Sequence, residues 1–221
     1  MKFLLTSGGL TNKAIAQALL DLAGKPAENV SVAFIPTAAN VEPGDKSWLI
    51  NDLQNLKKQG FKVIDIIDIS ALPQELWQPR IESADILFFS GGDTFYLMHW
   101  LKKSGLAELL PELLKSRVYA GISAGSMVAG NLALRHNEQL YPDEDPAKYP
   151  SEQGLGFFDF HFRPHLNSSH FPRVRREILE ALAKDLTEPI YALDDQSALK
   201  IVDGKIEVIG EGEYLVLNKN D

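Results

Sequence analysis

The chain has 221 residues, of which 45% are hydrophobic and 24% are charged, and its formal net charge is -8. This is the composition of an ordinary globular protein with enough apolar residues for a large core, and the length suits one α/β domain. The acidic balance disfavours nucleic acid and anionic membrane as partners, because both are bound by basic surfaces. The sequence contains no cysteine, which excludes disulfides, thiol catalysis and cysteine-ligated metals.

The N-terminal half alternates apolar strands with amphipathic helices. Mostly apolar runs predict strands at 3–5, 30–35, 61–69 and 84–89. Apolar residues at helical spacing predict helices through 15–22, 49–56 and 97–101. Continuous apolar runs are typical of parallel strands that are covered on both faces. We therefore predict a single α/β domain over residues 1–221, in which a mainly parallel sheet is flanked by helices in three layers.

The strongest functional motif is Gly121-Ile122-Ser123-Ala124-Gly125, which follows an apolar strand and opens a helix of small residues. In a nucleophile elbow such a turn exposes the serine above the sheet, and the two glycines let strand and helix approach closely. The first N–H groups of the helix suit an oxyanion. An ordinary tight turn is the alternative, but the strand and the helix on either side favour a nucleophile. Ser126, one helical turn further on, is the rival, and we expect it to pack instead.

Two glycine loops follow other predicted strands. They are Ser7-Gly8-Gly9 and Ser90-Gly91-Gly92-Asp93-Thr94. Paired glycines after a buried strand leave backbone N–H groups exposed, and Asp93 or Thr94 can cap the next helix. A plain loop with an ordinary helix cap is the alternative for the second segment. Ligands bind at the carboxyl ends of strands in open α/β sheets, so we expect both loops to gather around Ser123.

The C-terminal half begins with a proline-rich acidic loop at 140–150, which is either a lid over substrate or, as we favour, a solvated loop. Strict alternation predicts a half-buried strand at 158–163. Arg173, Arg175 and Arg176 open a helix, and most of them should be solvated. Further strands are predicted at 190–193, 198–202, 205–209 and 214–217, the middle two as a hairpin across Asp203-Gly204.

A serine nucleophile needs a base that is itself held by a third group. His165 and Asp195 both follow predicted strands, so we expect both at the same sheet edge as Ser123. Asp194 is the alternative acid. The chain order Ser, His, Asp differs from the Ser, Asp, His order of α/β-hydrolases and argues against that fold.

A metal site is the competing interpretation of the histidines. His161 and His165 are four residues apart, but Pro164 between them prevents the helix that would place both on one face. We therefore expect no metal and no cofactor.

Taken together, these motifs resemble the serine peptidase family of dipeptidase E and cyanophycinase. The segments that carry the resemblance are 89–94, 121–125, 154–156, 164–167 and 192–195. The resemblance implies a class I glutamine amidotransferase-like (flavodoxin-like) fold, with serine in place of the elbow cysteine. It implies Ser123 as nucleophile and His165 as base, with the N–H groups of Gly92 and Ala124 holding the oxyanion. Asp195 stands in register with a glutamate of dipeptidase E.

The function that the resemblance implies is hydrolysis of dipeptides or short peptides, with N-terminal aspartate as the first candidate. Substrate contacts are expected from Gly91, Asp93 and Arg173, although the three arginines do not align cleanly with the family's specificity arginine. The alternatives are a ligand-binding member of the fold without catalysis, or a hydrolase of another amide such as a cyanophycin-type isopeptide. A homodimer is compatible with the sequence. The apolar run at 3–5 is too short for a signal peptide or a spanning helix, so we expect a cytoplasmic protein.

Overall fold

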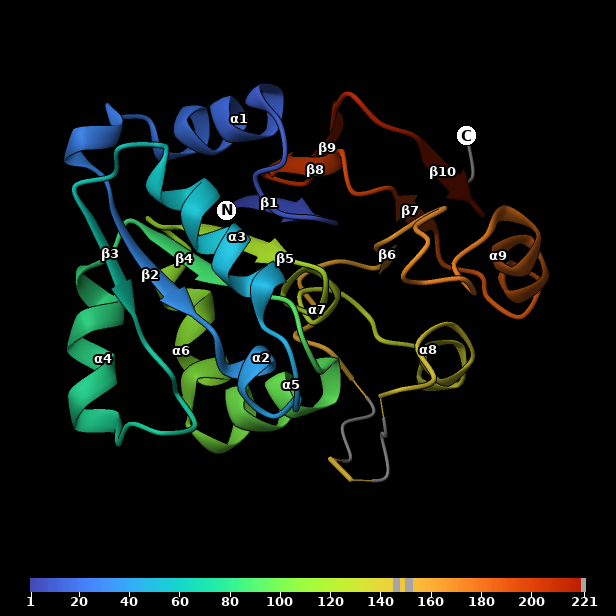
Figure 1. Cartoon of the computed structure of the whole chain (residues 1–221), viewed down its shortest axis with the longest axis horizontal. Helices are drawn as coiled ribbons and strands as arrows, with labels where there is room; N and C mark the ends of the chain where they lie inside the picture. Colours follow the sequence, from blue (N-terminus) through green and yellow to red (C-terminus); the bar gives the residue numbers. More distant parts are fainter. Residues whose placement is uncertain (145–147, 150–152, 220–221) are drawn as a thin grey trace.

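A computed structural model of the chain describes residues 1–144, 148–149 and 153–219, with the backbone alone for 134 and 135. It confirms the predicted α/β architecture with a large, mostly parallel sheet between helices (Figure 1). The strand order of the seven-stranded sheet is β3-β2-β4-β5-β1-β8-β9. The strands are β1 (Lys2–Thr6), β2 (Ser31–Ile35), β3 (Val63–Ile66), β4 (Ile86–Phe89), β5 (Val118–Ile122), β8 (Ser197–Val202) and β9 (Lys205–Gly210).

The first five strands are parallel to one another, and β8 and β9 form the predicted hairpin antiparallel to β1. Because the five parallel strands end at one edge, the loops after β1, β4 and β5 lie side by side there. In the register of the ladders, Gly121 stands between Leu5 and Phe89. The segments that begin with Ser7, Ser90 and Ser123 therefore leave the sheet at the same level, as the sequence predicts.

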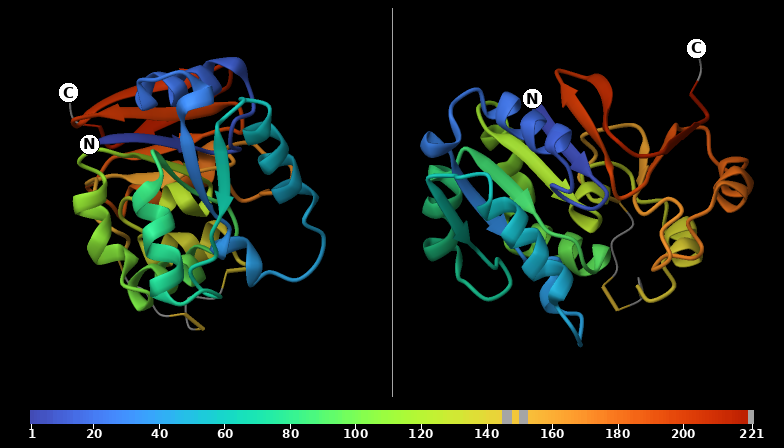
Figure 2. Two further views of the ribbon diagram at one scale, coloured as in Figure 1. Left: turned by 90° about the vertical axis from the view of Figure 1, so that its left-hand side faces the viewer. Right: turned by 45° about the horizontal axis from the view of Figure 1, so that its top comes forward.

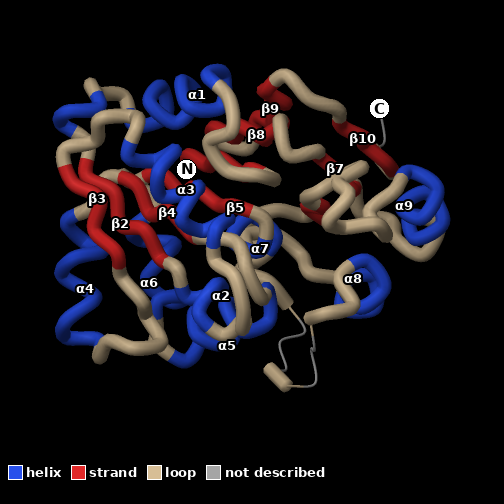
Figure 3. The backbone as a smooth tube through the Cα atoms, in the orientation of Figure 1, coloured by secondary structure: helices blue, strands red, loops and turns tan. Residues whose placement is uncertain are grey.

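Helices cover both faces of this sheet (Figure 2, Figure 3). Side chains of α1 and α3 pack on one face in a cluster that includes Leu19, Leu53 and Phe34, while α4, α5 and α6 pack on the other. The helices are α1 (Lys13–Ala23), α2 (Thr37–Asn40), α3 (Ser47–Lys57), α4 (Gln74–Ser83), α5 (Thr94–Lys103), α6 (Leu106–Leu113), α7 (Ala124–Met127), α8 (Leu134–Leu140) and α9 (Arg176–Ala183), with a 3-10 turn at Ala27–Asn29. In the part of the chain that the structure describes, no helix has the length and apolarity needed to cross a bilayer.

A second, three-stranded sheet corrects one expectation. It consists of β6 (His161–Arg163), β7 (Ile190–Leu193) and β10 (Tyr214–Leu217) in the order β10-β7-β6. The sequence places the strands before His165 and Asp195 in the sheet that carries Ser123. They pair with each other instead, β6 parallel to β7, and the chain turns at 194–196 before it enters β8 of the main sheet.

The alternating segment 158–163 is also not the half-buried strand that we expect. Only its last three residues form β6, and His161 and Arg163 on the supposed polar face are 3% and 1% exposed. The Arg163 guanidinium donates hydrogen bonds to the carbonyls of Phe162 and Leu132, both at 3.1 Å. Backbone carbonyls thus satisfy a buried arginine, which a pattern of alternating polarity does not reveal.

Candidate active site

Ser123 lies at the junction of β5 and α7, with φ 47° and ψ -109°. A non-glycine residue with positive φ is strained by roughly 1–3 kcal/mol, and elbows impose such strain. The flanking glycines make the turn fit. A Cβ on Gly121 would lie 2.6 Å from the backbone of Gly125, and a Cβ on Gly125 would overlap the carbonyl of Phe89. The predicted close approach of strand and helix is therefore present.

Thr6 fixes the base of the elbow. Its carbonyl accepts hydrogen bonds from the Ser123 N–H at 3.0 Å and from the Ser126 hydroxyl at 2.8 Å. Its own hydroxyl donates to the carbonyl of Gly121 at 2.7 Å. Ser126 is completely buried, and its side chain faces β1, as the sequence predicts. Of the two serines, only Ser123 has its hydroxyl beside a histidine.

His165 connects Ser123 to an acid. Its Nε2 lies 2.8 Å from Ser123 Oγ, and its Nδ1 lies 2.6 Å from Asp195 Oδ1. In the tautomer that suits both contacts, the Ser123 hydroxyl donates to Nε2 and the Nδ1–H donates to the carboxylate. The predicted hydrogen-bond reach between Ser123 and His165 is confirmed. Such an arrangement can take the proton of a serine as the serine attacks a carbonyl.

Asp194, the alternative acid, has other partners. Its carboxylate accepts hydrogen bonds from the backbone N–H groups of Gln196 at 3.0 Å and Glu213 at 2.7 Å, and from the Ser197 hydroxyl at 2.9 Å. It therefore closes the turn between β7 and β8. Of the two neighbouring acids, Asp195 contacts the histidine.

The surroundings of Asp195 favour its charged form. Burial alone would raise the pKa of this carboxyl, but the hydrogen bonds from His165 and Ser7 outweigh that effect and bring the pKa below its usual range. The carboxylate is therefore ionised near neutral pH. An ionised partner on Nδ1 stabilises the imidazolium that forms when Nε2 takes up a proton.

Ser7 is a site residue whose role sequence reasoning missed. Its hydroxyl donates to Asp195 Oδ1 at 2.8 Å and accepts the backbone N–H of His165 at 2.7 Å. Ser7 itself is fully buried. One side chain thus holds the acid and the backbone of the base at the same time. The position of Ser7 after β1, at the carboxyl edge of the sheet, indicates that it lies near the site. That position alone does not predict its hydrogen bonds to Asp195 and His165.

An aromatic ring covers the imidazole. The rings of His165 and Phe171 are parallel within 5°, and their centroids are 3.9 Å apart. The backbone of His165 has φ 67°, a left-handed conformation that turns the side chain out of line with β6. Nothing in the sequence around Phe171 predicts this contact, because the residue lies in an irregular loop.

The N–H groups of Gly92 and Ala124 donate to no other residue that the structure describes. Gly92 has φ 125°, and a Cβ there would overlap Ala38, so only glycine fits. A Cβ on Gly91 would lie 3.4 Å from the Ser123 Cβ, so this segment borders Ser123. Asp93 caps α5 by accepting the N–H of Tyr96 at 2.7 Å. Substrate contacts by Gly91 and Asp93 stay predictions.

Part of the predicted loop 140–150, residues 145–147 and 150, lies outside the described residues. The favoured interpretation as a solvated loop is wrong for two residues in the rest of it. Tyr141 is buried and donates to the carbonyl of Pro164 at 3.1 Å. Glu144 accepts hydrogen bonds from the hydroxyl of Thr94 at 2.7 Å and from its N–H at 3.1 Å, and burial raises the pKa of its carboxyl to about 8. Glu144 therefore packs onto the first turn of α5.

The three arginines have separate partners. Arg173 is exposed and donates to the carbonyl of Gln139 at 3.4 Å, so its predicted contact with substrate stays a prediction. Arg175 donates to three carbonyls of its own loop, those of Ser168, Phe171 and Val174. Arg176 pairs with Glu180 at 3.5 Å.

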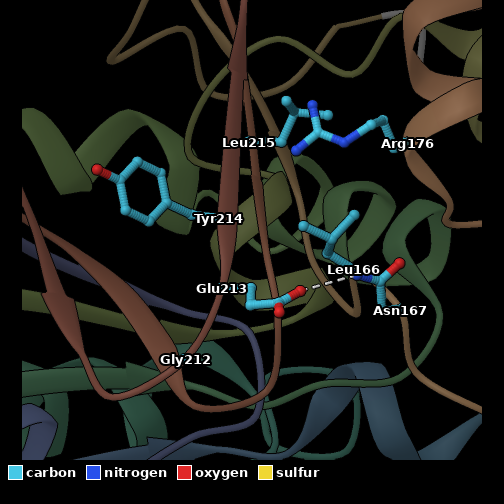
Figure 4. A pocket seen from close by; sticks show the side chains of 7 residues that line it. All are labelled: Leu166, Asn167, Arg176, Gly212, Glu213, Tyr214 and Leu215. Carbon is cyan, nitrogen blue, oxygen red and sulfur yellow. Dashed lines mark hydrogen bonds between the residues drawn. The ribbon is translucent and has the colours of Figure 1, made fainter.

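Arg176 also lines a cavity of about 320 Å³ beside β10 (Figure 4). There Asn167 donates a hydrogen bond to Glu213 at 3.1 Å. None of Ser123, His165 and Asp195 lines this cavity.

We compared the chain with protein-family models, curated proteins and solved structures. The sequence model of peptidase family S51 matches residues 3–209. Peptidase E of Haemophilus influenzae strain PittGG is 34% identical over 209 residues, 91% of this chain and 82% of that protein. Peptidase E of Pasteurella multocida is 30% identical over 210 residues, with the same coverage of 91% and 82%. Among solved structures, a Listeria monocytogenes EGD-e protein described as a candidate peptidase E superimposes with a TM-score of 0.77 at 22% identity, covering 96% of this chain and 98% of that one.

Proposed function

Because the chain belongs to peptidase family S51, we propose that Ser123, His165 and Asp195 carry out its serine-peptidase reaction. The observation that carries the proposal is the continuous pair of contacts, 2.8 Å from Ser123 Oγ to Nε2 and 2.6 Å from Nδ1 to Asp195 Oδ1. These distances are those of hydrogen bonds that can pass a proton. The same contacts argue against a member of the fold that only binds a ligand.

In the proposed reaction, Ser123 Oγ attacks the carbonyl carbon of the scissile peptide bond while His165 Nε2 takes its proton. The N–H groups of Gly92 and Ala124 hold the oxyanion that forms on the former carbonyl oxygen. His165 then gives the proton to the leaving amine, and an acyl-enzyme on Ser123 remains. Water, deprotonated by the same imidazole, releases the acid and restores the serine.

The test is labelling by a fluorophosphonate, in which Ser123 Oγ forms a bond to phosphorus and fluoride leaves. We expect labelling of the unmodified protein and none of Ser123→Ala, with dipeptide hydrolysis lost in the same variant. Ser126→Ala is the matched control, because it removes a buried hydroxyl three residues away. If Ser123→Ala were still labelled at the native rate, the assignment of the nucleophile would be wrong.

As substrates we propose dipeptides and other very short peptides, with N-terminal aspartate preferred and Arg173 as the anchor of its carboxylate. The support is the peptidase E relatives and the exposed position of Arg173. A charge-assisted hydrogen bond contributes roughly 1.5–3 kcal/mol, so Arg173→Met should raise KM for Asp-Xaa about tenfold or more and leave Ala-Xaa unchanged. Equal activity on both peptides before and after the substitution would exclude the aspartyl preference. A cytoplasmic location and a homodimer also stay proposals, the latter open to sedimentation analysis.

A further inference from the structure

The stack of Phe171 on His165 is the closest and most nearly parallel aromatic pair among the described residues. Its centroid separation is 3.9 Å and its interplanar angle 5°, whereas the next closest pairs, Phe3 with Phe158 and Phe89 with Tyr119, have centroids 4.6 Å apart. Neutral aromatic rings stack in parallel when they are offset from each other, so this pair suits a neutral imidazole. A cation over the face of a phenyl ring is attracted in addition. The stack therefore holds the imidazole in both states, and its attraction grows when the imidazole becomes charged.

In the reaction proposed above, His165 is charged only after it has taken the proton of Ser123. The Phe171 face then lies against the imidazolium at the stage where the oxyanion forms. An interaction that strengthens as charge develops lowers the barrier, while one that is equal in both states does not. We propose that Phe171 is a positioning residue of the catalytic histidine, which fixes the plane of the imidazole and stabilises its charged form. This inference rests on the proposed role of His165 as the base.

The stack also supplies a constraint that the two hydrogen bonds leave open. Contacts at Nδ1 and Nε2 fix two points in the plane of the ring, and the ring can still tilt about the line between them. A flat side chain parallel to the imidazole resists that tilt, yet it permits the small movement within the plane that carries Nε2 from Ser123 to the leaving amine. An unaligned ring weakens both hydrogen bonds, because their strength falls steeply as the angle at the proton decreases.

Phe171 is itself held in place from two sides. Arg175 donates hydrogen bonds to the carbonyl of Phe171 at 3.0 Å and to that of Ser168 at 2.9 Å, which fixes the loop that carries the ring. The ring of Tyr141 meets Phe171 edge-on, at 73° and 6.0 Å between centroids. Arg175, one of the arginines considered for substrate binding, therefore supports the aromatic ring through the backbone.

The experiment measures the rate of fluorophosphonate labelling, which uses His165 as base without a peptide substrate, together with kcat and KM on a dipeptide. Three replacements of Phe171 are compared: Tyr, which keeps the flat ring; Leu, which keeps apolar volume without a ring; and 3,4,5-trifluorophenylalanine, which keeps the shape and weakens the negative face. The fluorinated residue at Phe34 is the control, because Phe34 is a core ring on β2 of the main sheet, whereas β6 belongs to the smaller sheet. Thermal unfolding verifies that each variant is folded, and Phe171→Met replaces the Leu variant if that one does not accumulate.

We expect Phe171→Tyr to keep the native labelling rate and Phe171→Leu to lose about tenfold, with kcat reduced in parallel and KM unchanged. The trifluorinated residue at 171 should lose about threefold to fivefold, and at 34 nothing. A native rate in the Leu variant would overturn the positioning role, and a native rate with the fluorinated ring would overturn the charge stabilisation. Failure of the proposed function is distinct, because the unmodified protein would then show no labelling that depends on Ser123.

Discussion

Removing the Ser7 hydroxyl should lower kcat although the side chains of Ser123, His165 and Asp195 are all retained. In Ser7→Ala, the carboxylate of Asp195 loses a donor at 2.8 Å, and the N–H of His165 loses an acceptor at 2.7 Å in a buried place. The hydrogen bond to a charged group contributes roughly 1.5–3 kcal/mol, and an unsatisfied buried N–H costs about 1–3 kcal/mol. If the loss of the hydrogen bond to Asp195 raises the energy of the transition state by this amount, kcat should fall about tenfold to a hundredfold. KM should change little, because Ser7 is buried away from substrate.

Ser197→Ala is the matched control for this prediction. Ser197 is also buried, and its hydroxyl donates to a carboxylate at 2.9 Å, but that carboxylate belongs to Asp194. Both variants should lower the melting temperature, by roughly 2–4 °C for each kcal/mol in a chain of this size. Only Ser7→Ala should lower kcat on a dipeptide, measured at a temperature where both variants are folded. An equal fall in the two variants would refute the assignment of Ser7 to the site.

Three further outcomes follow from buried polar contacts. Ser126→Ala should keep native kcat and lose about 1 kcal/mol of unfolding free energy in urea, because its hydroxyl only donates to Thr6. Glu144→Gln should raise the melting temperature at pH 8 and have little effect at pH 5. The pKa of Glu144 in the folded protein is raised to about 8, so its carboxyl destabilises the fold increasingly as the pH rises from the ordinary glutamate pKa toward 8. An equal gain at both pH values would contradict that sign. For Asp195 the folded pKa is lowered, so its contribution to stability is present above the ordinary aspartate value and is lost as pH falls through the folded pKa. The difference in melting temperature between the native protein and Asp195→Asn should therefore shrink in acid, and a constant difference would contradict the charged state.

The parts of the site that could be predicted are those whose geometry is local in the sequence. Gly121 and Gly125 reveal a close approach of strand and helix, because any side chain at either position would collide with the neighbouring backbone. The Gly92 loop is recognisable for the same reason. Parallel strands bring such loops to one edge by topology alone. The position of Ser123 and the loops around it thus follow from the residue types at a few positions and from the order of the elements.

The remaining parts depend on pairing between distant segments. Segments as short as 161–163 and 190–193 do not specify which strand they will join, so the three-stranded sheet could not be predicted. The buried Arg163 contradicts its pattern because backbone carbonyls compensate for its burial. Asp194 and Asp195 are chemically alike, and the turn alone decides between them, by using the first as acceptor of its own N–H groups. Nothing in the sequence predicts the contact of Phe171 with His165.

The candidate site is divided between two sheets, and the loop after β1 connects its two parts. Ser123 follows a strand of the main sheet, whereas His165 and Asp195 follow strands of the smaller one. The segments that carry His165 and Asp195 are joined by a hydrogen bond from the Leu166 N–H to the Leu193 carbonyl at 3.0 Å. The loop bridges the two: Ser7 contacts both His165 and Asp195, and the Thr11 hydroxyl donates to the Asp195 carbonyl at 2.8 Å.

Gly8 lies so close to this bridge that a Cβ there would stand 2.9 Å from the carbonyl of Asp195. A side chain at Gly8 would push Asp195, and with it the imidazole of His165, away from Ser123 on the other sheet. A displacement near 1 Å is enough to cost about a hundredfold in rate when reacting groups must be aligned. The distance between His165 and Ser123 therefore depends on a loop that contains neither of them.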